Sequence, residues 1–167
     1  MKSIIEGERA LCFWLSQQTE VSLNHPDEQV KQEASDYVSL MTPVVKSLFT
    51  DLAMEITSDA MQIHGGYGFT KDQGIEQLYR DNRITPIYEG TNSVQAADLV
   101  FRKLSNKNGD IINKFLDMVR SEIKSDSEKV KNFSKEINYY LDILSKFTDW
   151  IKDKTEIEKD DVSSAAN

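Results

Sequence analysis

One carboxylate in the sequence occupies a position suited to proton transfer. Glu89 lies in the stretch PIYEGTNSV, residues 86–94, between an apolar shoulder that ends at Tyr88 and a glycine, Gly90. An acid pressed against an aromatic ring is partly desolvated, which raises its pKa and makes it a better proton acceptor near neutral pH. Gly90 leaves room for a substrate to approach the backbone. A simple capping turn with an exposed acid has the same pattern, and the residues alone leave both interpretations open.

A second candidate feature is the turn QIHGGYGF, residues 62–69. A predicted helix ends here in consecutive glycines, Gly65 and Gly66, which allow the backbone to approach a ligand closely. Free backbone amides in such a turn can hold phosphate oxygens. Gln62 lies in the last helical turn, and its side-chain amide can both donate and accept hydrogen bonds. An ordinary helix C-cap has the same spacing, and on spacing alone it is favoured over a ligand site.

The stretch between these two features is rich in charged residues. EQLYRDNRI, residues 76–84, places Glu76, Arg80, Asp81 and Arg83 on a short predicted helix. We expect these side chains to form salt links that hold an irregular insert together, rather than to form a binding site.

Helices dominate the elements that must position these residues. Apolar stripes at spacings of three and four fall within residues 4–15, 30–41, 43–64 and 94–104. Thr42 and Pro43 predict a helix start, because threonine is a capping residue and proline suits the first helical position. No strand alternation of useful length occurs. The sequence therefore predicts an all-α fold, most simply a four-helix bundle interrupted by a glycine-rich insert.

The pattern changes after residue 104. The polar, turn-forming stretch SNKNGD, residues 105–110, predicts a linker. An apolar seam with a period of 3.5 residues follows, made of Val130, Phe133, Ile137, Tyr140, Leu144, Phe147 and Ile151. We expect a helical hairpin that packs on the domain or on a neighbour. The predicted organisation is a bundle domain at 1–104 and a helical extension at 105–167, cut short where it ends.

The composition excludes several classes of function. A net charge of −8 argues against nucleic acid or an anionic membrane as the main partner, and the longest apolar run, Leu11–Leu15, is too short to cross a membrane. Two histidines without a CxxC motif predict no zinc site. The single cysteine, Cys12, excludes an internal disulfide, and its apolar setting predicts a buried thiol on a helix enclosed by neighbours. We expect a cytoplasmic protein.

Two motifs taken together resemble a known family. QIHGGYGF followed by YRDNRITPIYEGTNSVQ is similar to the C-terminal domain of flavin-dependent acyl-CoA dehydrogenases. The ordered combination of GG-x-G-[FY], Y-R-D and I-Y-E-G-T is far more specific than any one piece, and the resemblance covers residues 1–104. EGERALCFWL, and HPDE followed by TPVVKSLFTD, resemble more narrowly the large dehydrogenases that act on 3-methylmercaptopropionyl-CoA. AADLVFRKL, residues 96–104, followed by further helices is similar to their extended helical tail.

The resemblance implies roles for individual residues. Glu89 falls on the family's catalytic base, which removes a proton from the carbon next to the thioester carbonyl while a hydride leaves the adjacent carbon for the flavin. The resemblance also implies that Gly90 lies at the thioester and that Tyr88 lines the acyl pocket. The family positions that contact FAD across a subunit interface are matched by Gln62, Gly65 and Gly66. Thr91 matches an FAD contact on the subunit's own side.

The resemblance also implies a cofactor and partners. These are FAD, an acyl-CoA substrate, an electron-transfer flavoprotein or another electron acceptor, and a homo-oligomer, dimer or tetramer, in the intact enzyme. Whole members of the family also have an N-terminal helical domain and a middle β-domain, which this sequence lacks. We therefore expect a C-terminal portion that is inactive alone. The alternative is a helical interaction or oligomerisation module without catalysis, which would not need an acid on an apolar, glycine-hinged turn.

Overall fold

The computed structural model describes residues 1–104, 111–125 and 128–155. Every regular element within these ranges is a helix, so the predicted all-α class is confirmed. The chain divides into two compact units, Met1–Ala96 and Ala97–Asn167. The linker expected at 105–110 lies outside the described residues, and a domain boundary at that point stays a prediction. Within the described ranges, no helix combines the length and apolar character needed to cross a membrane.

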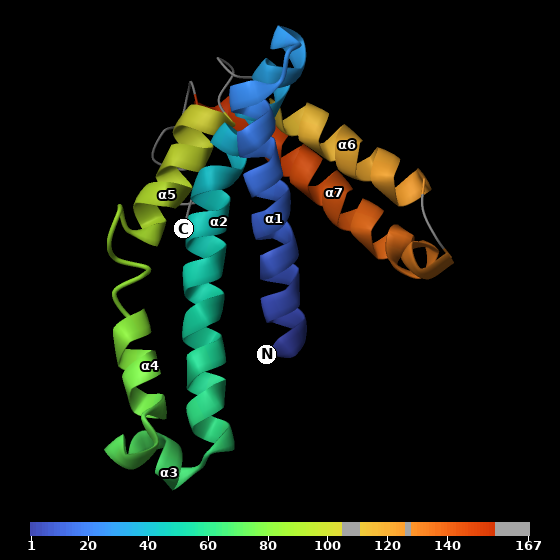
Figure 1. Ribbon diagram of the computed structural model, residues 1–167. Coiled ribbons are helices and arrows are strands. Elements are labelled where there is room, and N and C mark those ends of the chain that lie inside the picture. The colour runs from blue at the N-terminus through green and yellow to red at the C-terminus, as the bar shows by residue number, and fades with distance from the viewer. Residues whose placement is uncertain (105–110, 126–127, 156–167) are drawn as a thin grey trace. The chain divides into compact units, whose positions relative to one another are not determined.

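Two long antiparallel helices form the frame of the first unit (Figure 1). α1 spans Lys2–Asn24 and α2 spans Glu28–Ile63, and they pack side by side. The Asp27 carboxylate caps α2, because it accepts hydrogen bonds from the backbone N–H groups of Gln29 at 2.8 Å and Val30 at 3.3 Å. The short connection and its cap fix where α2 begins.

α2 runs unbroken through Pro43, so the helix start predicted at Thr42 and Pro43 is wrong. A proline inside a helix removes one N–H donor and clashes with the preceding turn, at a cost of about 3 kcal/mol. Pro43 is buried, and that burial offsets part of the cost. The Thr42 hydroxyl donates to the Val38 carbonyl at 2.6 Å, as it does inside a helix, instead of capping a new one. The stripes at 30–41 and 43–64 therefore share α2, and the four expected stripes lie on three helical segments.

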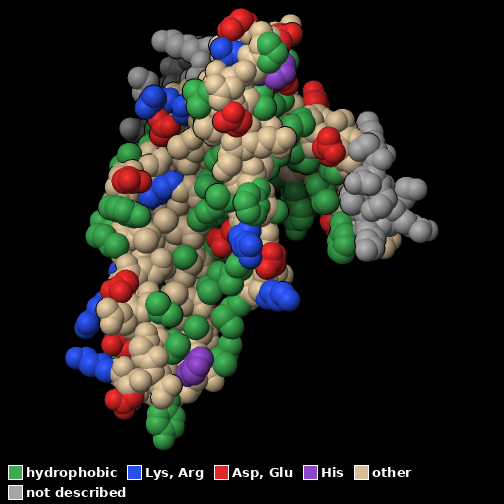
Figure 2. All heavy atoms as spheres, in the orientation of Figure 1, with side chains coloured by type: hydrophobic (Ala, Val, Ile, Leu, Met, Phe, Trp, Pro, Cys, Tyr) green, Lys and Arg blue, Asp and Glu red, His purple; other side chains and the backbone are tan. Residues whose placement is uncertain are grey.

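α1 is less enclosed than the sequence predicts. The structure describes it throughout and none of its residues is buried, while Cys12 is exposed and Phe13 is 70% exposed. Its inner face meets α2, where the Trp14 and Tyr37 ring centroids lie 6.1 Å apart. In the first unit this helix has one long partner, so only one of its apolar stripes is covered. Apolar side chains accordingly reach the visible surface (Figure 2).

Three short elements follow α2: α3 (Gly66–Phe69), η1 (Lys71–Gln73) and α4 (Ile75–Asn82). They reverse the chain so that α4 lies beside the C-terminal half of α2 (Figure 1). The predicted stop of α2 at the glycine pair is confirmed, with Gly65 at a φ of +58°. Gly68 is needed for close packing, because a Cβ there would lie 2.5 Å from the Met61 carbonyl oxygen.

The second unit contains a helical hairpin. α5 (Asn92–Asp98) crosses from the first unit and continues into a π-helical turn, η2 (Leu99–Lys103). α6 (Ile111–Ser125) and α7 (Glu128–Thr155) then pack on each other, and the Arg120 guanidinium meets the Asp142 carboxylate at 3.0 Å. The buried side chains of α7 match the expected seam at Ile151 and differ from it elsewhere. Leu141, Thr148 and Ile151 are buried, whereas Phe133, Tyr140 and Phe147 are 62%, 67% and 40% exposed.

Replacing Asp27 with alanine should lower the free energy of unfolding by about 1 kcal/mol, because two N–H groups at the start of α2 lose their acceptor. Urea unfolding followed by circular dichroism measures the change. Asp59→Ala is the matched control, since it removes an exposed carboxylate from the same helix far from its N-terminus. Equal losses in the two variants would contradict the capping role.

The raised pKa of Tyr37 predicts that the protein loses stability at alkaline pH. Burial raises the pKa of Tyr37 to about 12, and the hydrogen bond to Glu33 at 2.9 Å and the charges of Glu33 and Asp36 act in the same direction. Folding therefore favours the neutral phenol. This stabilisation is complete below the unfolded-state pKa of about 10 and is lost as the pH rises toward about 12.

The measurement is the free energy of unfolding of the parent chain and of Tyr37→Phe across this pH range. The stability of the parent should fall relative to that of Tyr37→Phe, which has no ionisable hydroxyl. Tyr67→Phe, at an exposed position, is the control and should follow the parent. A constant difference between the parent and Tyr37→Phe over this range would show that the Tyr37 pKa is not raised.

Candidate functional site

Glu89 occupies a strained backbone conformation. Among the described residues it is the one non-glycine residue with a positive φ, at +55°, and Gly90 follows at +83°. The left-handed region costs a residue with a Cβ about 1–2 kcal/mol and persists only where the surroundings enforce it. Such strain at an acidic residue in a turn is an observation that points toward function.

A cluster of polar side chains on α2 holds this turn. Lys46 Nζ donates to the Gly90 carbonyl at 2.8 Å and to Asn92 Oδ1 at 2.7 Å. Asn92 Nδ2 donates in turn to Asp51 Oδ1 at 2.7 Å and to Thr50 Oγ1 at 3.0 Å. The oxygen and the nitrogen of the Asn92 amide are therefore both bonded to α2, and they tie the start of α5 to that helix.

Further hydrogen bonds within residues 86–95 stabilise the turn from inside. Gln95 Nε2 donates to the Glu89 carbonyl at 2.9 Å, and the Asn92 N–H donates to the Pro86 carbonyl at 3.2 Å. Thr91 Oγ1 accepts from the Val94 N–H at 3.3 Å and so caps the start of α5. The backbone around Glu89 is thus fixed from both directions.

The Glu89 carboxylate is exposed, so its expected shielding by the Tyr88 ring is wrong for this chain. Tyr88 itself is 49% exposed, and no described part of the first unit covers this face of the turn. The apolar residues around it are also exposed, namely Ile84, Ile87 and Val94. A covering group would have to come from outside the first unit. The turn therefore presents an acid on an apolar surface that can receive a ligand or a partner.

The paired-glycine turn lies at the C-terminal end of α2. Gln62 and Gly65 border a hollow of about 230 Å³ together with Ser58, Met61 and Phe69. The Gly65 N–H donates to the Gln62 carbonyl at 3.1 Å, so this amide serves the ordinary helix cap. The Gln62 side chain is exposed beside the hollow and can meet a ligand there.

The two groups of candidate residues are not brought together. Gln62 lies sixteen residues after Lys46 on one continuous helix, a separation of about 24 Å at 1.5 Å per residue. Gln62, Gly65 and Gly66 thus belong to one end of α2, and Tyr88, Glu89, Gly90 and Thr91 lie near the position of Lys46. One small ligand cannot contact both groups.

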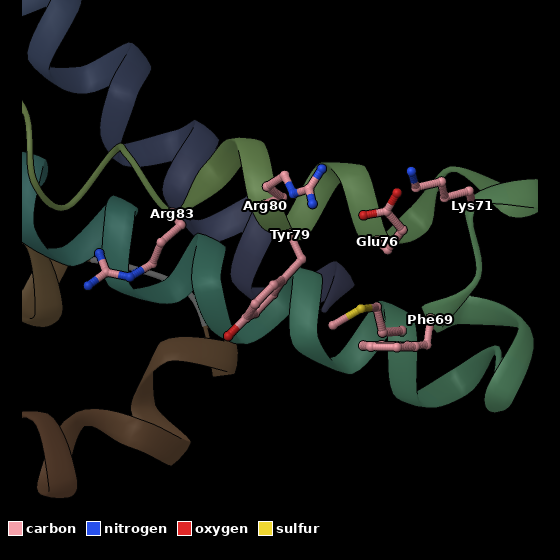
Figure 3. Close-up of a pocket in the computed structure, with 7 residues that line it drawn as sticks. Phe69, Lys71, Glu76, Tyr79, Arg80 and Arg83 are labelled. Carbon is pink, nitrogen blue, oxygen red and sulfur yellow. The ribbon is translucent and has the colours of Figure 1, made fainter.

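A hollow of about 600 Å³ lies beside the C-terminal half of α2, where α4 faces that helix (Figure 3). Its lining residues are Met61, Phe69, Lys71, Glu76, Tyr79, Arg80 and Arg83. Among the described residues no ion pair within 4.0 Å involves the charged side chains of EQLYRDNRI, so their interpretation as salt links is wrong. Three cations and one anion line the hollow, and this excess of positive charge favours an anion. A neighbouring hollow of about 380 Å³ shares Tyr79 and Arg83 and extends to Thr91.

Sequence reasoning missed Lys46 and the anchoring roles of Asn92 and Gln95. A lysine on a long amphipathic helix gives no signal by itself, because lysines are common on such helices. The available hint was the grouping of polar residues on a largely apolar stretch, since Thr50 and Asp51 follow Lys46 by four and five residues.

Comparisons with known proteins identify the same segment. The family model for the acyl-CoA dehydrogenase C-terminal domain matches residues 23–104, which include both turns. A 3-methylmercaptopropionyl-CoA dehydrogenase from Ruegeria pomeroyi is 39% identical over 71% of this chain and 20% of its own length. A butyryl-CoA dehydrogenase from Syntrophomonas wolfei is 33% identical over 69% of this chain and 19% of its own. A broad-specificity linear acyl-CoA dehydrogenase from Mycobacterium tuberculosis is 35% identical over 65% and 18%.

The chain spans about a fifth of the length of these curated relatives. The resemblance carried by the two motifs is confirmed, because the matched residues contain them in the same order. Residues 23–104 of this chain are the C-terminal domain of the acyl-CoA dehydrogenase family.

Proposed function

We propose that the chain is the C-terminal part of an FAD-dependent acyl-CoA dehydrogenase. The intact enzyme converts an acyl-CoA thioester into the trans-2-enoyl-CoA, and 3-methylmercaptopropionyl-CoA is a candidate substrate because a relative is named for it. The observation that carries the proposal is the acid of the I-Y-E-G-T motif, Glu89, on a strained turn fixed to α2 and surrounded by exposed apolar side chains.

Glu89 is the proposed catalytic base. Its carboxylate takes the proton from the carbon next to the thioester carbonyl, and bound FAD supplies the acceptor for the hydride of the adjacent carbon. The Glu89 N–H donates to the thioester oxygen, which stabilises the negative charge that develops there. Gly90 gives the thioester room, and Tyr88 contacts the acyl chain. Substrate and the rest of the enzyme cover the exposed carboxylate and exclude water from it.

The proposed FAD contacts fall into two groups, in keeping with the separation along α2. Gln62, Gly65 and Gly66 contact the cofactor across a subunit interface, and Thr91 contacts the one on its own side. The Thr91 oxygen accepts from the Val94 N–H, and its O–H can donate to the cofactor. Two cofactors, one near the middle of α2 and one at its C-terminal end, account for residues that lie about 24 Å apart.

The proposal includes partners and a cellular setting. Contact across a subunit interface requires a homo-oligomer, a dimer or a tetramer, and reduced FAD requires an electron-transfer flavoprotein or another acceptor. A single cysteine supports a reducing, cytoplasmic setting. Exposed apolar residues on α1, such as Phe13 and Leu23, support burial of that helix in the intact enzyme.

A second candidate function is a helical interaction module without catalysis. The exposed aromatic residues of α7, Phe133, Tyr140 and Phe147, favour it because such residues are typical of protein contacts. An interaction surface on α7 does not require a strained acid at Glu89, and therefore the dehydrogenase proposal accounts for more of the structure.

Glu89→Gln in the full-length dehydrogenase should abolish turnover while FAD stays bound. Glutamine keeps the shape of the side chain but cannot accept the proton, and loss of a general base costs about 10²–10⁴-fold in rate. Anaerobic reduction of the flavin by a panel of acyl-CoA thioesters measures the effect. Glu55→Gln, at an exposed carboxylate of α2, is the control. Unchanged reduction in Glu89→Gln would refute the proposed base.

The 167-residue chain alone should bind FAD weakly or not at all and have no dehydrogenase activity. Its described elements are helices, and in this proposal part of the FAD contacts come from a second subunit. The measurement is the ratio of flavin absorbance to protein after reconstitution with FAD, with the full-length enzyme treated identically as the control. Purification of the chain with one FAD per chain would overturn this expectation.

A further inference from the structure

We propose that Lys46 is a positioning residue that holds Glu89 in its reactive orientation, a role that rests on the proposed function of Glu89 as the base. Lys46 lies on α2, forty-three residues before Glu89. Its ammonium contacts the carbonyl of Gly90 and the side chain of Asn92, the residues that follow the acid. Lys46 therefore acts on the backbone that carries Glu89 and not on its carboxylate.

The strain at Glu89 explains why such a clamp is needed. Glu89 and Gly90 both have positive φ values, +55° and +83°, and a residue with a Cβ leaves that region unless contacts prevent it. Lys46 donates to the Gly90 carbonyl at 2.8 Å from a half-buried position. A hydrogen bond from a charged donor is stronger than a neutral one, and partial burial reduces its screening by solvent. This bond joins the strained pair to a different element of the fold.

Asn92 extends the clamp to the start of α5. Its Oδ1 accepts from Lys46 at 2.7 Å, and its Nδ2 donates to the Asp51 carboxylate at 2.7 Å. A cation on one side and an anion on the other fix which end of the amide faces each partner. The order Lys46–Asn92–Asp51 thus sets where α5 begins relative to α2. Because Glu89 lies three residues before Asn92, this also sets the direction of the base.

Small displacements of a base have large effects on proton transfer. The carboxylate must lie within hydrogen-bonding reach of the proton that it removes, and a misplacement of about 1 Å can cost about a hundredfold in rate. Loss of Lys46 leaves two acceptors, Gly90 O and Asn92 Oδ1, without their charged donor. The turn then relaxes, and the orientation of Glu89 is lost while the residues that would contact substrate remain.

The first test measures the turn in the chain itself by hydrogen–deuterium exchange. In Lys46→Met, exchange of the backbone amides within residues 87–95 should rise about tenfold or more, because a hydrogen bond from a charged donor is lost. Lys31→Met is the matched control: Lys31 is half-buried on the same helix and pairs with Glu28 at 3.2 Å, far from the turn. Unchanged exchange at 87–95 in Lys46→Met would overturn the proposal.

The second test measures catalysis in the full-length enzyme. Lys46→Met should lower the rate constant of flavin reduction about a hundredfold and increase the α-deuterium isotope effect, because proton abstraction becomes slower. FAD content and the Kd for acyl-CoA should change less than about threefold, which separates loss of positioning from loss of binding. A merely structural role would lower FAD content and substrate binding together with the rate, and this result would overturn the proposal.

A second variant keeps the proposal testable if Lys46→Met does not fold. Asn92→Ala leaves the lysine in place and removes the link to Asp51, and it should raise exchange at 87–95 and slow flavin reduction in the same direction. Normal exchange and normal reduction in this variant would count against the clamp.

Failure of the proposed function gives a different result. If no acyl-CoA reduces the flavin of the unsubstituted enzyme, the dehydrogenase proposal is wrong, and the catalytic role of Lys46 is wrong with it. If the unsubstituted enzyme is reduced and Lys46→Met is reduced equally fast, only the role of Lys46 is overturned.

Discussion

The candidate site depends on the hydrogen-bonded link between α2 and the turn that carries Glu89. Lys46 and Asp51 bind opposite ends of the Asn92 amide, and Lys46 also holds the Gly90 carbonyl. Because these bonds start from a long helix, they enforce a left-handed conformation that Glu89 would otherwise leave. The position of the acid is therefore determined by residues far away in the sequence, and not by the I-Y-E-G-T motif alone.

Because α2 continues through Pro43, one rigid helix connects the two groups of candidate residues. One helix from Glu28 to Ile63 carries the polar cluster near its middle and the paired-glycine turn at its end. A break at Pro43 would have left the cluster on a separate helix of about six turns, whose direction relative to α1 could vary. As one helix, α2 packs along α1 and keeps the two groups of candidate residues at a fixed separation of about 24 Å. In the dehydrogenase proposal that spacing determines which residues contact which cofactor.

Local patterns in the sequence predicted the helices and the motif but not their surroundings. Spacings of three and four located the helical stretches, and Gly65 correctly ended α2, because both signals depend on neighbouring residues. Pro43 was read as a helix start because the local rule ignores the burial that offsets its cost. Cys12 was expected to be buried, yet exposure depends on how many partners α1 has, and composition does not report this. Lys46 was missed because its partners lie more than forty residues later.

In the dehydrogenase proposal the base needs both a fixed orientation and removal of water, and the first unit supplies only the first of these for Glu89. Orientation is a property of the backbone, and here it is supplied within the first unit by the strained turn and its bonds to α2. Desolvation is a property of what covers the carboxylate, and the first unit leaves Glu89, Ile87 and Tyr88 exposed. In such a site the backbone strain is introduced once, during folding. Water is removed later, when the substrate and the rest of the enzyme cover the carboxylate. This accounts for an exposed acid on a rigid turn, because the bonds to α2 hold the strained conformation before any group covers Glu89.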